Sequence, residues 1–313
     1  MNKHLMVVVG SVNSDLLLSQ ERLPARGETL VATDVREEFG GKGANQAVQC
    51  ARLGQEVAFI GAVGNDSRGE AARVNLEHQG VECRLSLESA VTGLGFVQIL
   101  PGGEVHATIV RGANAALSTD WVRAQGDLFR RAGVVILQNE VPADVDAVTI
   151  ELGRAEGALV VYNAAPARSL DAGLSRLCDY LVVNEEEASF LAGRALDSED
   201  AVRQALPELQ HYCARIVVTL GSAGSILAIG NHVVRVEAVP AAAVDTTGAG
   251  DAFVAAFAAA LNQGHVPETA ARFASAVAAQ ATLAVGAQTA MAVREVPGRD
   301  SVRAQGEDPQ PAG

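Results

Sequence analysis

Short continuous runs of apolar residues recur along the chain, each closed by glycine, proline or polar residues. Such runs, without polar alternation, are typical of strands buried on both faces of a parallel sheet. We therefore predict a series of inner strands. The runs cover 5–10, 57–64, 133–140, 159–166, 180–187 and 215–221.

The segments between these runs carry apolar residues at helical spacing. Strand and helix thus alternate at short intervals, which is the signature of βαβ units with helices on both faces of a mostly parallel sheet. The chain is predicted to be an α/β protein. The predicted helices cover 45–54, 66–80, 144–157, 186–193 and 198–213, followed by one after Gly250 and one around 268–286.

Two early segments, about 14–39 and 92–110, lack helical spacing and interrupt this alternation. Their LPARGE and PGGE turns predict antiparallel strands. We expect both segments to leave one main domain, residues 1–297, and to form a small β-sheet lid together. A pair of hairpins decorating the sheet edge is the alternative, but polar residues just inside each departure favour the lid. The polar tail 298–313 is predicted to be disordered.

Composition excludes several classes of partner. The 313 residues carry a net charge of −13 and only 4% aromatics, which disfavours nucleic acid and anionic membrane surfaces. The N-terminal apolar run is too short for a signal-peptide core, and no run is long enough for a membrane span. Four cysteines without a CxxC pair fit free thiols in a reducing compartment. We expect a cytoplasmic protein.

The stretch DTTGAGDAFVAAF, 245–257, places a flexible turn and a carboxylate at the start of a helix. One interpretation is a tight glycine turn with Asp251 near the helix N-terminus. The other is an anion site, in which backbone N–H groups of Gly248, Ala249 and Gly250 hold a phosphate while Asp251 orients an attacking hydroxyl. The stretch alone leaves both open.

Further polar residues follow predicted strands, where ligands of open α/β sheets bind. Asn13 and Asp15 are two residues apart, so an extended chain presents both on one face. An ionised carboxylate there suits a sugar diol, although an Asx turn is the alternative. Glu140 ends another strand in the same way.

The segment FGGKGANQAV, 39–48, is not a P-loop, because Lys42 lies between glycines and no Ser or Thr follows it. Gly41 allows a ligand to approach the backbone, and Asn45 offers both a donor and an acceptor. A glycine turn with a helix-capping Asn explains the same residues without a ligand. We expect the helix to begin near 44–45.

Asn184 and Glu187 are three residues apart after another strand. They could hold a hydrated Mg²⁺, or form a capping box, or do both. The TLGSAG segment places Thr219, Gly221 and Gly224 where a nucleotide could lie, although this spacing is weak evidence. No histidine has the spacing of a zinc site or of a hydrolase triad.

Taken together, GGKGANQAV, RGANAALS, NAAPAR, VNEEEA, TLGSAG and DTTGAGDAF occur in the order and spacing of the ribokinase family of carbohydrate and nucleoside kinases. The resemblance covers about residues 5–295. It implies a three-layer α/β/α domain with a β-sheet lid that often forms a dimer. It also implies ATP as co-substrate, Mg²⁺ as cofactor, and phosphorylation of the 5-hydroxyl of D-ribose.

The resemblance also implies residue roles. Asp251 matches the catalytic base, and Gly248, Ala249 and Gly250 match the anion hole. The matching sugar contacts are Asn13, Asp15, Gly41, Lys42, Asn45, Glu140 and Asp251; the matching nucleotide contacts are Asn184, Thr219, Gly221, Gly224, Gly250 and Ser275, with Glu187 linked to Mg²⁺ through water.

A monovalent cation, usually K⁺, activates members of this family beside the anion hole. One departure follows that region, because Ala290 stands where Ser is frequent, and this removes one possible oxygen ligand. The positions that match the cation site are Asp245, Thr247, Ala281, Ala284 and Gly286.

Three alternatives are weighed against phosphorylation of ribose. A kinase of the same family acting on deoxyribose, a ketohexose or a nucleoside would keep the same motifs. A dinucleotide-binding oxidoreductase would need GxGxxG after the first strand, where this chain has GSVNSD. A non-catalytic sugar-binding regulator on the same fold would not need the acid at 251.

Overall fold

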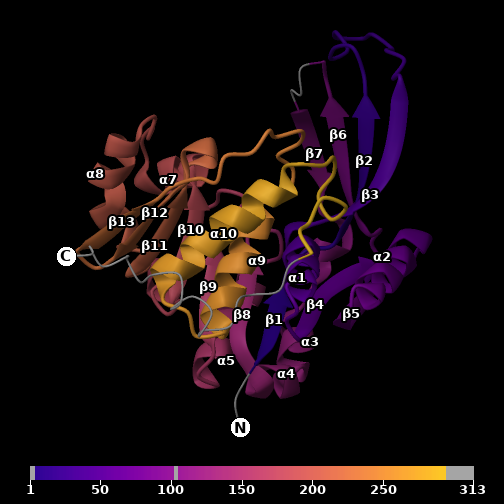
Figure 1. Cartoon of the computed structure of the whole chain (residues 1–313). Helices are drawn as coiled ribbons and strands as arrows, with labels where there is room; N and C mark the ends of the chain where they lie inside the picture. The colour runs from indigo at the N-terminus through magenta and orange to yellow at the C-terminus, as the bar shows by residue number, and fades with distance from the viewer. Residues whose placement is uncertain (1–3, 102–104, 294–313) are drawn as a thin grey trace, which may run out of the picture.

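Two sheets organise the chain in the computed structural model, which describes residues 4–101 and 105–293 (Figure 1). The larger sheet has nine strands, and every neighbouring pair from β5 to β11 is parallel, whereas β12 and β13 pair antiparallel at one edge. In spatial order the strands are β13 (His232–Val236), β12 (Ser225–Ile229), β11 (Arg215–Thr219), β10 (Tyr180–Asn184), β9 (Leu159–Asn163), β8 (Ala132–Gln138), β1 (Leu5–Val9), β4 (Val57–Gly64) and β5 (Val81–Glu88).

Helices cover both faces of this sheet, as the sequence predicted, and give a three-layer α/β/α sandwich (Figure 1). One face carries α1 (Lys42–Arg52), α2 (Ser67–His78), α9 (Ala249–Asn262) and α10 (Pro267–Ala281). The other face carries α3 (Thr119–Ala124), α4 (Gly126–Arg131), α5 (Ala143–Ala155), α6 (Ala172–Ser175), α7 (Glu185–Ala192) and α8 (Glu199–Leu209). Within the described part of the chain, no helix is long and apolar enough to cross a membrane.

Strand β1 shows why the inner strands are apolar throughout. Successive side chains of a strand point to opposite faces. Met6 and Val8 pack in the core beneath α1 and α9, whereas Val7 and Val9 pack in the core beneath α4 and α5. Because water reaches neither face, the strand has no polar position.

The second sheet projects beyond the carboxyl ends of the parallel strands (Figure 1). Its strands, in order, are β3 (Asp34–Gly40), β2 (Asn13–Ser19), β6 (Gly93–Ile99) and β7 (Val105–Val110). The expected antiparallel pairing is correct within each segment, for β2–β3 and β6–β7. The two segments join through β2 and β6, which pair parallel. Strands β1 and β5 run in the same direction in the main sheet, because both pair parallel with β4. The first strand of each segment that leaves the main sheet after them, β2 and β6, therefore runs outward in the same direction.

Several boundaries differ from the predicted ones. Helix α1 begins at Lys42, earlier than 44–45, and α10 ends at Ala281 rather than 286. After α10 the carbonyl of Thr282 accepts hydrogen bonds from the backbone N–H groups of Val244 and Asp245, which ties this turn to the loop before α9. The expected tail, 298–313, lies outside the described residues.

We expect Phe257→Ala to lower the free energy of unfolding by about 3–5 kcal/mol, because it deletes a fully buried ring. The Phe257 ring packs edge-on against Tyr180, with 5.1 Å between centroids, and stacks near Phe253. Urea denaturation measures the change. As a control, Phe190→Ala removes a half-exposed ring of α7 and should cost less than about 1 kcal/mol. Equal losses for the two variants would contradict the packing assigned to α9.

Candidate active site

Asp251 lies in the first turn of α9, buried beneath the start of α1. Each oxygen of its carboxylate accepts a hydrogen bond from a side-chain amide. Asn45 Nδ2 donates to Oδ2 over 2.9 Å, and Gln46 Nε2 donates to Oδ1 over 2.9 Å. Burial raises the pKa of Asp251, whereas Lys42 and the two amides oppose that rise. The carboxylate is thus held in one orientation by fixed donors.

The turn before Asp251 has the geometry of an anion site. Gly248 caps α9 with φ +77°, and a Cβ there would lie 3.1 Å from Cα of Ala287. Gly250 and Asp251 occupy the second and third helical positions, whose N–H groups have no intrahelical acceptor. A Cβ on Gly250 would meet nothing within 4 Å, so open space lies in front of this backbone. N–H groups without an acceptor at the start of a helix attract anions.

Lys42, the first residue of α1, lies among acidic side chains. Burial lowers the pKa of its ammonium group, but the surrounding carboxylates outweigh burial, and the net pKa is raised. Lys42 therefore stays charged and balances part of the negative charge of the site. The carboxylates are those of Asp251, Glu140, Glu187 and Asp15.

Glu140 follows β8 and reaches across to the starts of β2 and α1. Its Oε2 accepts hydrogen bonds from Ser11 Oγ and from the backbone N–H of Lys42, the latter over 3.0 Å. Ser11 Oγ in turn lies 3.4 Å from the donating N–H of Gly43. The loop after β8 is thereby joined to the turn that starts α1.

The projecting sheet contributes Asn13 and Asp15 from β2. Asn13 Oδ1 accepts from Asn114 Nδ2 over 2.8 Å. The Asp15 carboxylate lies between Gly40 and Gly95, where a Cβ at either glycine would come within 2.2 Å of its oxygens. Asp15 Oδ1 is buried and has no hydrogen-bond partner among the described residues. An unpaired buried carboxylate oxygen fits a ligand hydroxyl.

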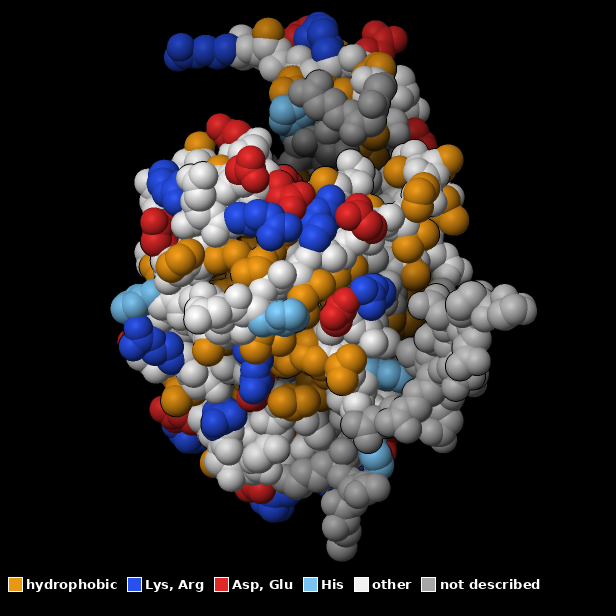
Figure 2. Space-filling view, turned by 60° about the vertical axis from the view of Figure 1, so that its left-hand side comes forward, with side chains coloured by type: hydrophobic (Ala, Val, Ile, Leu, Met, Phe, Trp, Pro, Cys, Tyr) orange, Lys and Arg blue, Asp and Glu red, His pale blue; other side chains and the backbone are white. Residues whose placement is uncertain are grey.

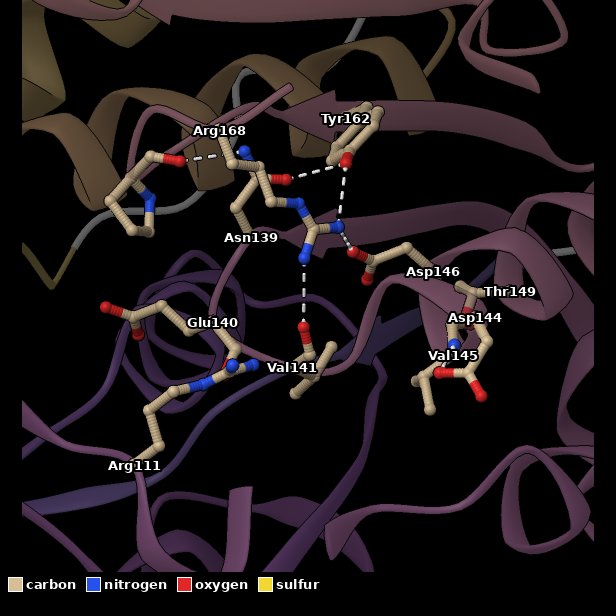
Figure 3. A network of polar contacts seen from close by, with 11 residues as sticks. Arg111, Asn139, Glu140, Val141, Asp144, Val145, Asp146, Thr149, Tyr162 and Arg168 are labelled. Atoms are coloured by element: carbon tan, nitrogen blue, oxygen red, sulfur yellow. Dashed lines mark hydrogen bonds and ion pairs between the residues drawn. The ribbon is translucent and has the colours of Figure 1, made fainter. Parts of the chain in front are cut away.

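A polar network supports the loop that carries Glu140 (Figure 3). The Arg168 guanidinium lies between the Asp146 carboxylate and the carbonyl of Val141, to which Nη1 donates over 3.1 Å. Tyr162 Oη donates to Asn139 Oδ1 over 2.6 Å.

The second half of this network ties the loop to the segment after β9. Asn139 Nδ2 donates to the carbonyl of Pro166 over 2.8 Å, and the backbone N–H of Asn139 donates to the carbonyl of Ala165, also over 2.8 Å. Burial raises the pKa of Asp146 to about 8, although the facing Arg168 opposes this rise. The loops after β8 and β9 thus form one unit beside the site.

A cavity of about 450 Å³ opens next to the turn at 248–250, between the β11–β12 connection and α10. Its wall is mostly apolar and includes Phe253, Val239 and Ala278. Figure 2 shows hydrophobic side chains gathered at the centre of this face, with a band of acidic and basic side chains between them and the projecting sheet and further charged side chains below. The predicted nucleotide contacts that line the cavity are Thr219, Gly221, Gly224, Gly250 and Ser275.

Asn184, the remaining predicted nucleotide contact, does not line this cavity. It ends β10 beside Thr219 and caps α7. Asn184 Oδ1 accepts from the N–H of Glu187, and Glu187 Oε2 accepts from the N–H of Asn184, each over 2.8 Å. The capping box is therefore present, and burial raises the pKa of Glu187.

The predicted cation loop brings two distant segments together. Asp245 Oδ1 accepts from the N–H and hydroxyl of Thr247, and Oδ2 accepts from the N–H of Gly286 over 2.8 Å. Burial alone would raise the pKa of Asp245, but these hydrogen bonds outweigh it and lower the pKa. The described residues contain no cluster of three acidic, histidine or cysteine side chains fit for a metal.

Several residues of the site escaped the sequence analysis. Gln46 binds the predicted base directly, and its spacing from Lys42 was an available signal, because residues i and i+4 share a helix face. Ser11 binds Glu140. Asn163, the last residue of β9, and Gln288, in the segment after α10, also reach the site. Asn163 lies in the NAAPAR motif, for which no side-chain role was predicted, whereas no local pattern marks Gln288.

Comparison with known proteins agrees with this geometry. The sequence profile of the pfkB family of carbohydrate kinases matches residues 3–294. This chain belongs to that family. It is therefore a phosphotransferase whose acceptor is an alcohol group, and the resemblance found in the motifs is confirmed.

Individual family members match over most of their length. A ribokinase of Bacillus subtilis (strain 168) is 34% identical over 288 residues, 92% of this chain and 96% of that protein. A deoxyribokinase of Salmonella typhi is 34% identical over 257 residues, 81% and 84% of the two chains. A structure of Arabidopsis thaliana ribokinase complexed with ribose and ATP has a TM-score of 0.83 and 34% identity, covering 97% of this chain and 98% of that one.

We expect Asp15→Asn to stabilise this family member at alkaline pH. Burial, then Glu140 and Glu38, raise the pKa of Asp15 from 3.8 to about 6, so ionised Asp15 destabilises the folded state. Protonated Asp15 does not destabilise the folded state, and the free energy of unfolding falls as the group ionises between about pH 4 and pH 6. At pH 8 the variant should gain up to about 3 kcal/mol in free energy of unfolding, and the gain should vanish near pH 4. Denaturation at both pH values measures this; no gain at pH 8 contradicts it.

Proposed function

We propose that this protein is a ribokinase, which transfers the γ-phosphate of ATP to the 5-hydroxyl of D-ribose. The observation that carries the proposal is the position of one buried carboxylate. Asp251 lies in the first turn of α9, directly after Gly250, whose N–H has no intrahelical acceptor, and next to the cavity that suits a nucleotide. Relatives named ribokinase match nearly the whole chain, and one of their structures holds ribose and ATP.

Asp251 acts as the general base. It accepts the proton of the sugar hydroxyl and directs the oxygen at the γ-phosphorus, and such proton transfer is worth roughly 10²–10⁴-fold in rate. The N–H groups at 248–250 stabilise charge on the transferred phosphoryl group. One well-placed donor of this kind contributes about 3 kcal/mol in the transition state. The Lys42 ammonium adds a fixed positive charge nearby.

The sugar occupies the space between β2 of the projecting sheet and the start of α1. The unpaired Asp15 Oδ1 accepts from its vicinal hydroxyls, while Asn13, Asn45 and Glu140 supply further polar contacts. The backbone turn at Gly41 completes this side of the site. The projecting sheet acts as a lid that excludes water, which would otherwise compete as phosphoryl acceptor.

The nucleotide occupies the cavity lined by Thr219, Gly224 and Ser275, with its phosphates directed at the α9 turn. A bound Mg²⁺ would neutralise charge on the phosphates there. Glu187 fits such an ion through water, because a nearby cation favours the ionised form of this buried carboxylate.

The loop at 245–247 and the turn after α10 form the site for K⁺. Asp245 supplies a carboxylate, and the backbones of Thr247, Ala281, Ala284 and Gly286 supply carbonyl oxygens. The hydrogen bond between Asp245 and Gly286 supports this assignment, because it brings the two segments together. Because most of these ligands are backbone carbonyls, the cation site does not require a side-chain hydroxyl at position 290, which is Ala.

Deoxyribose is the second candidate acceptor. A deoxyribokinase matches this chain at the same 34% identity as one of the ribokinases. The two sugars differ by one hydroxyl, so the unpaired oxygen of Asp15 favours ribose, which retains the vicinal diol.

We also propose a cytoplasmic homodimer formed through the lid. Val35 and Phe96 are exposed apolar residues on one face of the lid sheet, as its register shows. The four cysteines are unpaired, which fits a reducing compartment. Sedimentation equilibrium tests the dimer, and Val35→Glu with Phe96→Glu should then shift the protein to monomers.

A coupled assay of ADP release tests the activity. Ribose, deoxyribose, fructose, tagatose and nucleosides are compared as acceptors, with and without K⁺. Ribose should give the highest kcat/KM, and K⁺ should raise its rate. A higher kcat/KM with deoxyribose would move the assignment to the second candidate, and no ADP release with any sugar would refute the kinase.

We expect Asp251→Asn to lower kcat by about 10²-fold or more, because the amide cannot accept the proton. Ribose affinity should change little. Steady-state kinetics give kcat, and calorimetry gives the affinity. Glu186→Gln on the surface of α7 is the control and should keep wild-type turnover. Near-normal turnover of Asp251→Asn would remove this residue from the mechanism.

A further inference from the structure

A chain of three side-chain amides leads from α2 to Asp251. Asn75 Nδ2 donates to Gln288 Oε1 over 2.8 Å. Gln288 Nε2 donates to Asn45 Oδ1 over 3.2 Å, and Asn45 Nδ2 donates to Asp251 Oδ2 over 2.9 Å. Asn45 and Gln288 thus each accept through the oxygen and donate through the nitrogen, and all three hydrogen bonds run in the same direction towards Asp251.

The carboxylate itself fixes this direction. Ionised Asp251 only accepts hydrogen bonds, so Asn45 must present its NH₂ group. The Asn45 oxygen then faces Gln288, which must present its own NH₂ group, and the Gln288 oxygen is left to accept from Asn75. Reversing any one amide would place two oxygens or two NH₂ groups face to face.

A second set of amides holds the other carboxylate oxygen. Gln46 Nε2 donates to Asp251 Oδ1 and to Asn163 Oδ1, while Gln46 Oε1 accepts from Gln138 Nε2 over 2.6 Å. Asn163 Nδ2 donates to the carbonyl of Val182, so its own orientation is fixed by backbone. Gln46 is therefore constrained from both sides.

Gln138 donates to Gln46, but its own side-chain oxygen is left without a hydrogen bond from the described part of the chain. Gln138 is fully buried, and its Oε1 has no hydrogen-bond partner among residues 4–101 and 105–293. That oxygen lies against Gly10, where a Cβ would come within 2.0 Å of it. A buried oxygen without a hydrogen-bond partner destabilises the folded state. An apolar side chain would avoid that cost, so the Gln138 NH₂ group serves the Gln46 contact.

Gln288 is held firmly although it lies in a loop. It is 5% exposed, and Arg52 Nη1 donates to its carbonyl over 2.6 Å and to that of Met291 over 3.0 Å. Farther along α1, Gln49 exchanges two hydrogen bonds with the backbone of Ala292. The segment after α10 therefore packs along α1 and places the Gln288 amide against Asn45.

We propose that Gln288 is a positioning residue, which fixes the amide of Asn45 so that its NH₂ group faces the Asp251 carboxylate. The inference rests on the proposed function of Asp251 as base. Gln288 contacts no reacting atom. It acts by keeping a donor, rather than an acceptor, next to the carboxylate.

The sign of the effect follows from the charge. A donor at Asn45 stabilises ionised Asp251 and keeps its pKa down, whereas the Asn45 oxygen would destabilise the ionised form. Gln288→Glu introduces a carboxylate that must accept, so Asn45 turns its NH₂ group away from Asp251. The acid limb of the kcat/KM profile should then move to higher pH. Gln288→Met has similar length but no hydrogen bond, so it should move the limb less.

Other charged groups that face Asp251 remain in every variant. Lys42 of α1 lowers the pKa of Asp251 and Glu140 after β8 raises it, and Asp15 of β2 and Glu187 of α7 interact with it as like charges. They set the position of the wild-type acid limb. The inference concerns only the difference between variants.

The experiment compares wild type with Gln288→Glu and Gln288→Met in pH profiles of kcat/KM for ribose. We expect Gln288→Glu to shift the acid limb upward by about one to two pH units, a roughly 10–100-fold change in proton affinity. Gln263→Glu, exposed at the C-terminal end of α9, adds the same charge at the opposite end of that helix from Asp251 and should leave the profile unchanged. Thermal unfolding shows whether each variant folds.

A measurement without substrate separates this inference from the proposed function. The ¹³C signal of the Asp251 carboxyl, assigned by its loss in Asp251→Asn, is titrated by NMR in the free protein. The midpoint should rise in Gln288→Glu, and to a smaller extent in Gln288→Met. Unchanged midpoints in both folded variants overturn the role of Gln288. If the Asp251 titration midpoint rises as expected in the variants but the wild-type protein phosphorylates no sugar, the proposed function is overturned while the role of Gln288 stands.

Discussion

The proposed catalysis depends on keeping one carboxylate charged inside the protein. Asp251 is almost fully buried, and burial by itself favours its neutral form, which cannot take up a proton. The structure opposes burial with the Lys42 charge and with two amide donors from α1. Helix α1 therefore matters to Asp251 as much as the turn of α9 that carries it. A rotation of α1 by one residue would remove all three groups at once.

Close backbone packing makes that placement possible. Gly43 of α1 lies so near the end of β1 that a Cβ would come within 2.7 Å of the Ser11 nitrogen. Gly41 has φ +89° and would place a Cβ 2.7 Å from Cα of Val12. Close packing against β1 thus explains why glycine is needed at both positions, and this packing also determines where the functional residues of α1 lie. Because α1 starts against β1, its first turn lies at the carboxyl end of the sheet beside Glu140 and Asp15.

Contacts between residues of one short motif could be predicted from the sequence, whereas contacts between residues far apart along the chain could not. Lys42, Asn45 and Asp251 belong to short contiguous motifs, so their chemistry was visible. Gln288 meets Asn45 across a separation of 243 residues, and only the packing of the last described segment along α1 brings them together. The parallel pairing of β2 and β6 was missed for the same reason, because two hairpin signals contain no information about how the hairpins align. The α/β layers were predictable, because continuous apolar runs are required wherever helices cover both faces.

Gly250 differs from the other glycines of the site, because the fold itself does not require a glycine at this position. Gly248 needs its positive φ to begin α9, and Gly41 and Gly43 are needed for close packing. Gly250 has no positive φ, and a Cβ there would meet open space, so nothing in the described chain requires glycine. Helix propensity would favour alanine by about 1 kcal/mol. The missing side chain is explained if a group outside the protein approaches the backbone, and an N–H at the second helical position attracts an anion. In the proposed function this group is the terminal phosphate of ATP, which is attacked by a hydroxyl that Asp251 orients.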